Sequence, residues 1–147
     1  MKNTFLIASV LLFLGACKKE DDAPVSLSKS DLIGVWDIEK YEEYSLPGNS
    51  INSTDNFVSG SFTWTFRSDD TAVIYQAGTP SSTTYFTYSI LSSNGKNTIV
   101  TRELGSSNDD YTLQIIKFDL PYMECDNKEA LTKNGDDHYD KYYLKKQ

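Results

Sequence analysis

The stretch Ser61-Phe62-Thr63-Trp64-Thr65-Phe66-Arg67 decides the fold class of this chain. Aromatic side chains alternate with polar ones, and a period of two is typical of a β-strand with one buried face. The same period occurs at 84–91 and at 110–115. The chain also carries 10 tyrosines and 7 phenylalanines, residues that favour strands over helices. We therefore predict an all-β fold.

Residues that favour turns separate the apolar runs, for example Ser68-Asp69-Asp70 and Ser92-Ser93-Asn94-Gly95. Short links of this kind predict an up-and-down antiparallel meander, and eight strands in that order can close into a barrel without free edges. Two short helical turns are expected, at 28–32 and at 127–133, the second capped by Asn127. The eight predicted strands are 33–45, 60–67, 71–77, 83–91, 96–104, 110–119, 121–126 and 139–145.

The N-terminus has the features of a secretory signal. Lys2 precedes an apolar run at 5–14, which is too short to span a bilayer, and the small residues Gly15 and Ala16 precede Cys17. The run Leu14-Gly15-Ala16-Cys17 resembles the lipobox of bacterial lipoproteins. This resemblance implies that residues 1–16 are removed and that the Cys17 sulfur carries a diacylglyceryl group. The alternative is an ordinary secretory signal followed by a cysteine that occurs by chance.

Residues 17–30 are polar, charged and interrupted by proline, which predicts a flexible tether. The acidic cluster Glu20-Asp21-Asp22 resembles the surface-export signal of lipoproteins in the Bacteroidota. That resemblance implies an outer-membrane lipoprotein, held at the cell surface by the lipid on Cys17. A solvated spacer that leaves the protein on the periplasmic side is the alternative.

The remaining residues, 31–147, suit a single domain. The chain has 14 basic and 21 acidic side chains, a balance that argues against a nucleic-acid partner. Once Cys17 is acylated, Cys125 has no partner for a disulfide, and we expect it to pack as a small apolar side chain. We expect a monomer.

The start of the domain, Leu32-Ile33-Gly34-Val35-Trp36, places Gly-x-Trp at the head of the first strand. This pattern resembles the first motif of the lipocalins, and the resemblance extends from Leu32 to the end of the chain. It implies a lipocalin-like barrel in which Trp36 plugs the closed end. In that family an arginine near the last strand packs on the tryptophan; here Lys141 or Lys145 would have to replace it, or the contact is absent.

The inward side chains of the alternating strands are the expected interior of the barrel. Two interpretations remain open: these residues fill the barrel, or they line a site for a small apolar or amphipathic ligand, or a glycan, at the mouth away from Trp36. The residues are Phe62, Trp64, Phe66, Phe86, Tyr88 and Ile90.

No pattern of catalytic residues is evident. His138 is the single histidine, which excludes a zinc site with several histidines, and neither a Gly-x-Ser-x-Gly elbow nor a glycine-rich phosphate loop occurs. We expect no enzyme activity, no cofactor and no metal, although a pair of carboxylates brought together by the fold would revive catalysis. The alternative function is a protein-binding accessory module of the cell envelope. Its exposed face would be formed by Tyr41, Tyr44, Tyr85, Tyr139 and Tyr143.

Overall fold

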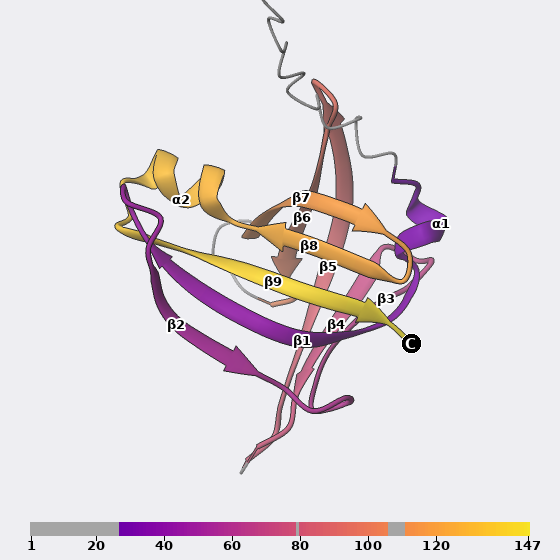
Figure 1. Cartoon of the computed structure of the whole chain (residues 1–147). Coiled ribbons are helices and arrows are strands. Elements are labelled where there is room, and N and C mark those ends of the chain that lie inside the picture. The colour runs from indigo at the N-terminus through magenta and orange to yellow at the C-terminus, as the bar shows by residue number, and fades with distance from the viewer. Residues whose placement is uncertain (1–26, 79, 106–110) are drawn as a thin grey trace, which may run out of the picture.

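The computed structural model describes residues 27–78, 80–105 and 111–147 (Figure 1). The predicted signal peptide 1–16, Cys17 and the tether up to residue 26 lie outside the described residues. The elements in chain order are α1 (Lys29–Leu32), β1 (Gly34–Ser45), β2 (Ile51–Asn56), β3 (Phe62–Phe66), β4 (Thr71–Gln76), β5 (Ser82–Ser93), β6 (Lys96–Glu103), β7 (Tyr111–Asp119), β8 (Tyr122–Asp126), α2 (Lys128–Asn134) and β9 (His138–Lys146).

The strands form a closed antiparallel barrel. Every strand from β3 to β9 pairs with its neighbour in the chain, and β1 pairs with both β3 and β9. Eight strands, β1 and β3–β9, therefore complete the circle, as the arrows in Figure 1 show. The predicted eight-stranded up-and-down barrel is confirmed, and each predicted strand is present with slightly different ends.

A ninth strand, β2, lies outside this circle. The first part of β1, Gly34–Asp37, pairs with β3, whereas Lys40–Tyr44 pairs with β2 instead. All six residues of β2 are exposed. Its sequence, Ile-Asn-Ser-Thr-Asp-Asn, has no apolar alternation, so the pattern that predicted the other strands could not reveal it.

The interior matches the predicted alternation. Trp64, Phe66 and Tyr88 are buried, and Phe62, Phe86 and Ile90 are partly buried against the same core. The rest of the buried apolar core comes from every part of the barrel. It comprises Leu32, Trp36, Ile38, Ala72, Ile99, Leu113, Ile115, Met123, Cys125 and Leu144.

Helix α1 leads directly into β1 at one end of the barrel, which we call the α1 end. A capping box stabilises the N-terminus of the helix, because the Ser28 side chain accepts from the Asp31 amide and the Asp31 carboxylate accepts from the Ser28 amide. Leu32 is fully buried, and its carbonyl accepts a 2.7 Å hydrogen bond from Trp36 Nε1. This bond satisfies the indole N–H at the base of the barrel.

Lys146, and neither Lys141 nor Lys145, packs on Trp36. Its Nζ lies 5.5 Å from the centroid of the indole ring and donates a 2.6 Å hydrogen bond to the Asp31 carbonyl. The expectation of Lys141 or Lys145 was wrong because Lys146 is the residue opposite Trp36 in the β1–β9 register, so the two side chains share a face. Gly34 makes room for this lysine, since a Cβ at that position would lie 2.9 Å from Lys146 Cε.

Helix α2 follows β8 and packs against β7 and β9. Asn127 occupies the N-cap position, but its side chain makes no capping hydrogen bond and binds Asp140 instead, so the predicted side-chain cap was wrong. Gly135 ends the helix in the left-handed conformation, with a φ of 83°. Neither helix in the described part of the chain is long and apolar enough to cross a bilayer.

Candidate functional site

The candidate site is the interior of the barrel around Trp64. This side chain comes from the centre of β3 and contacts two rings, Phe66 at 5.7 Å and Tyr142 at 5.8 Å between ring centroids. Trp64 is only 2% exposed, yet its Nε1 has no hydrogen-bond partner among the described residues. A buried indole N–H normally finds an acceptor, because leaving it unpaired costs about 1–3 kcal/mol.

Polar side chains lie on the side of Trp64 that faces β9 and β1. The Tyr142 ring is 5.5 Å from the Tyr41 ring, and Tyr41 Oη donates a 2.8 Å hydrogen bond to Asp140 Oδ1. Asn127 Nδ2 donates to Asp140 Oδ2, and Asn127 Oδ1 accepts from the Asp140 amide. An apolar aromatic cluster therefore merges with a hydrogen-bonded polar network.

Strand β6 adds two further buried polar residues that sequence reasoning missed. Asn97 and Thr101 flank the fully buried Ile99 at spacings of two, so all three share the inward face. The Asn97 Oδ1 accepts a 2.5 Å hydrogen bond from Ser92 Oγ. The parity with Ile99 could have indicated their position, but polar side chains in a strand are ordinarily assigned to the wet face.

The six predicted interior residues divide into two groups. Trp64, Phe66 and Tyr88 form one contact series, in which Phe66 and Tyr88 meet edge to face at 5.1 Å. Tyr88 Oη is already engaged, since it donates to the Arg67 carbonyl at 2.8 Å. Burial raises the pKa of Tyr88, so its hydroxyl stays protonated at neutral pH. The other three, Phe62, Phe86 and Ile90, lie at the edge of the core.

A depression of about 150 Å³ adjoins Tyr88 between β5 and β6. Most of its lining is polar or exposed, so it differs in character from the aromatic surroundings of Trp64. The lining residues are Thr87, Tyr88, Ser89, Val100, Thr101 and Arg102.

The outer face of the β1–β9 pair carries a second cluster, centred on Glu42. This carboxylate is 6% exposed and accepts 2.7 Å hydrogen bonds from both Tyr44 Oη and Tyr143 Oη, and a 3.1 Å bond from Lys40 Nζ. Burial works against ionisation of Glu42, but these three donors outweigh it and lower its pKa. Burial and the bond to Glu42 raise the pKa of Tyr143 to about 12.

The five tyrosines proposed for protein binding do not form one exposed face. Tyr44 stacks on the buried Tyr139, with 5.0 Å between ring centroids, and its hydroxyl is committed to Glu42. Tyr41 lies beside Tyr142 on the opposite face of the strands, and the exposed Tyr85 lies on β5. The geometry gives no support to a docking surface built from these residues.

Two further reactive side chains are Cys125 and His138. Cys125 is fully buried, and burial raises the pKa of its thiol, as expected for a packing residue. His138 is exposed, and its bond to Asp137 raises the pKa of the imidazole. Within residues 27–78, 80–105 and 111–147, no three His, Cys, Asp or Glu side chains converge on a metal position.

Comparison with known proteins leaves the site to be interpreted from its own geometry. The chain matches no protein-family model, no curated protein and no solved structure.

Proposed function

We propose that this chain is a lipocalin-like lipoprotein, anchored through Cys17 at the outer membrane and exposed at the cell surface, whose barrel binds one small amphipathic ligand without catalysing a reaction. The closed barrel supports a binding module, since some barrels of eight strands hold one small ligand. The lipobox-like run that ends at Cys17 and the acidic cluster after it support the proposed location at the outer membrane and cell surface.

The N–H of Trp64, which has no partner in the described part of the chain, is the observation that carries ligand binding. A buried N–H without an acceptor is rare in the core of a native protein. The Trp64 N–H can therefore donate one directed hydrogen bond to an acceptor that enters the barrel. Its neighbours Phe66 and Tyr142 provide apolar ring faces for the body of a ligand. The ligand class that fits is an apolar molecule with one oxygen acceptor, such as an ester or ketone.

The ligand is uncharged under this proposal. Asp140 is linked to Trp64 through the rings of Tyr142 and Tyr41, and its carboxylate disfavours the binding of an anion nearby. A free fatty acid therefore fits less well than its neutral ester.

Binding is tested in two steps. Native mass spectrometry of the protein made in its own host should detect a co-purified neutral lipid. Monoolein should then displace N-phenyl-1-naphthylamine from the barrel, and Trp64→Phe should weaken monoolein binding about three- to tenfold, the value of one hydrogen bond. Tyr85→Phe, which removes a hydroxyl on exposed Tyr85, is the matched control. Equal affinity of Trp64→Phe and the unchanged protein would remove Trp64 from the site.

The anchor is tested independently of the ligand. Cells grown with labelled palmitate should transfer the label to the unchanged protein and not to Cys17→Ser. Because Cys125 is fully buried, it cannot substitute as an acylation site in the folded protein. Label on the Cys17→Ser variant, or none on either protein, would contradict the anchor.

A further inference from the structure

Three exposed apolar side chains lie near the end of β9, at the α1 end of the barrel. Leu120, 50% exposed, lies in the β7–β8 turn; Tyr122, also 50% exposed, is the first residue of β8; and Val58, 79% exposed, lies on the loop between β2 and β3. We call these three residues the α1-end patch. Isolated exposed apolar residues are ordinary, but several that gather at one end of a domain mark an interaction surface.

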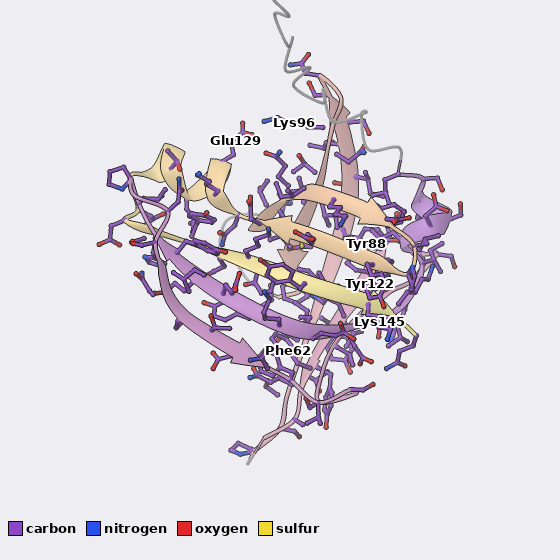
Figure 2. All side chains as sticks on the ribbon, in the orientation of Figure 1. Phe62, Tyr88, Lys96, Tyr122, Glu129 and Lys145 are labelled. Carbon is purple, nitrogen blue, oxygen red and sulfur yellow. The ribbon has the colours of Figure 1, made fainter. Side chains whose placement is uncertain are left out.

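Lys145 lies beside Tyr122 and next to the strand that carries Asp37. It lies opposite Tyr122 in the β8–β9 register and opposite Asp37 in the β1–β9 register. Its Nζ is 5.7 Å from the centroid of the Tyr122 ring, and Figure 2 shows the two side chains next to each other. A tyrosine ring beside a lysine is the combination found where proteins meet the headgroup region of a bilayer.

The loop that carries Val58 is held in place by a buried carboxylate. Asp37 accepts hydrogen bonds from Ser59 Oγ, the Gly60 amide and Gln147 Nε2, at 2.6, 2.8 and 2.9 Å. Val58 therefore projects from a fixed loop beside the C-terminus. A loop fastened in this way presents its apolar tip without paying a large ordering entropy on contact.

The described part of the chain begins at the same end, with Leu27 and α1. Lys146, which follows Lys145, donates from its amide to the Pro121 carbonyl and from Nζ to the Asp31 carbonyl, so it joins the β7–β8 turn to α1. Figure 1 shows α1, the β7–β8 turn and the C-terminus together at one side of the molecule. Nine residues lie between Cys17 and Leu27, so the ten steps from one to the other span at most about 35 Å even when fully extended.

We infer that the α1-end patch rests on the lipid surface to which Cys17 is anchored, which orients the other end of the barrel away from the membrane. This inference rests on the lipid anchor of the proposed function. A short tether keeps the patch at a high effective concentration near the bilayer, so three apolar side chains suffice for contact that they could not sustain in a free protein.

The test places an environment-sensitive fluorophore at the patch. Leu120→Cys is labelled with a thiol-reactive nitrobenzoxadiazole in the acylated full-length product, where Cys17 is blocked and Cys125 is buried. On vesicles of phosphatidylethanolamine and phosphatidylglycerol, the label should brighten about threefold as it enters the acyl boundary. Leu104→Cys is the control, because Leu104 has a similar exposure (54%) and lies far from β9. Leu104 directly follows β6, and its amide donates to the Tyr85 carbonyl of β5, which is four strands away from β9 around the barrel.

Two measurements distinguish failure of membrane docking by the α1-end patch from failure of the lipid anchor on Cys17. Mass spectrometry of the N-terminal peptide reports the acyl group on Cys17, and its absence would overturn the anchor and the docking together. An acylated protein whose label at 120 is no brighter than the label at 104 would overturn the docking alone. Loss of the brightening in a Val58→Ser, Tyr122→Ser background would show that the apolar side chains themselves make the contact.

Discussion

The two tryptophans of this barrel are almost equally buried but differ in how their polar atom is used. Trp36 is 0% exposed and Trp64 is 2% exposed. The N–H of Trp36 donates to the Leu32 carbonyl, and Lys146 covers its ring. The N–H of Trp64 has no partner within the described residues. Burial alone therefore does not distinguish an indole whose N–H is hydrogen-bonded from one whose N–H is not; the hydrogen-bond partner does.

The largest expected effect comes from a substitution that tests the difference between the two tryptophans directly. Trp36→Phe removes a satisfied donor and leaves the Leu32 carbonyl unpaired, so we expect it to lower the free energy of unfolding by about 2–4 kcal/mol. Trp64→Phe removes a donor that is unpaired among residues 27–78, 80–105 and 111–147, which offsets the loss of ring volume, and should cost less than about 1 kcal/mol. Urea unfolding of the two variants measures the difference. Equal destabilisation would show that the two sites are energetically alike.

A second prediction concerns the support of Trp36. Gly34 has a φ of +133°, and a Cβ there meets Lys146 Cε at 2.9 Å, so Gly34→Ala should cost about 1–3 kcal/mol. Gly48→Ala is the matched control, because no atom lies within 4 Å of a Cβ at Gly48. Adding Lys146→Ala separates the contact from the backbone strain: relief of most of the loss would assign it to the lysine. Thermal unfolding without any loss in Gly34→Ala would contradict the close approach.

The same contrast between paired and poorly paired groups appears in two buried carboxylates, Glu42 and Asp126. Three donors outweigh burial at Glu42 and lower its pKa, whereas burial dominates at Asp126 and raises its pKa. The charge of Glu42 therefore stabilises the fold, and the charge of Asp126 opposes it.

Glu42→Gln should destabilise the protein by about 1–2 kcal/mol at pH 7, because bonds to a charged acceptor become bonds to a neutral one. A lowered folded-state pKa gives stability that is present above the unfolded value, about 4.3, and is lost as the pH falls through the folded value. The difference in the free energy of unfolding between Glu42→Gln and the unchanged protein should therefore disappear as the pH falls below about 4.3. Urea unfolding across this range tests it, with half-exposed Glu39→Gln as the control. A difference that persists at low pH would contradict the role of the charge.

Asp126→Asn should have the smallest effect and the opposite sign. Asparagine keeps the acceptor for the Lys128 amide and removes the buried charge, so we expect a gain of about 0.5–1 kcal/mol at pH 7. Because the folded-state pKa of Asp126 is raised, its charge lowers the stability only above the unfolded-state pKa of about 3.9. The stability gained by Asp126→Asn should therefore vanish below about pH 3.9. Thermal unfolding at both pH values measures it. A loss of stability at pH 7 would mean that Lys141 compensates for the burial of the carboxylate.

Much of the fold was predictable because strand alternation is a local property. The series Phe62, Trp64 and Phe66 shows its inward face within seven residues, and all three side chains join the core. The alternation pattern did not predict β2, because all of its side chains are exposed and its strand conformation depends on pairing with β1. The contact of Lys146 with Trp36 was missed by one residue. The parity of Leu144, which shares the inward face of β9, would have pointed to Lys146.

By itself, the sequence determined the all-β class, the number and order of the eight barrel strands, and the aromatic character of the interior. These follow from a period of two and from turn residues, which act over a few positions along the chain. Only the tertiary structure decided which buried polar groups find partners. Trp36 meets Lys146 through the register of β1 and β9, whereas Trp64 projects from the middle of its strand among rings. Register depends on bulges and on strands far apart in sequence, so no local pattern could have separated the two indoles.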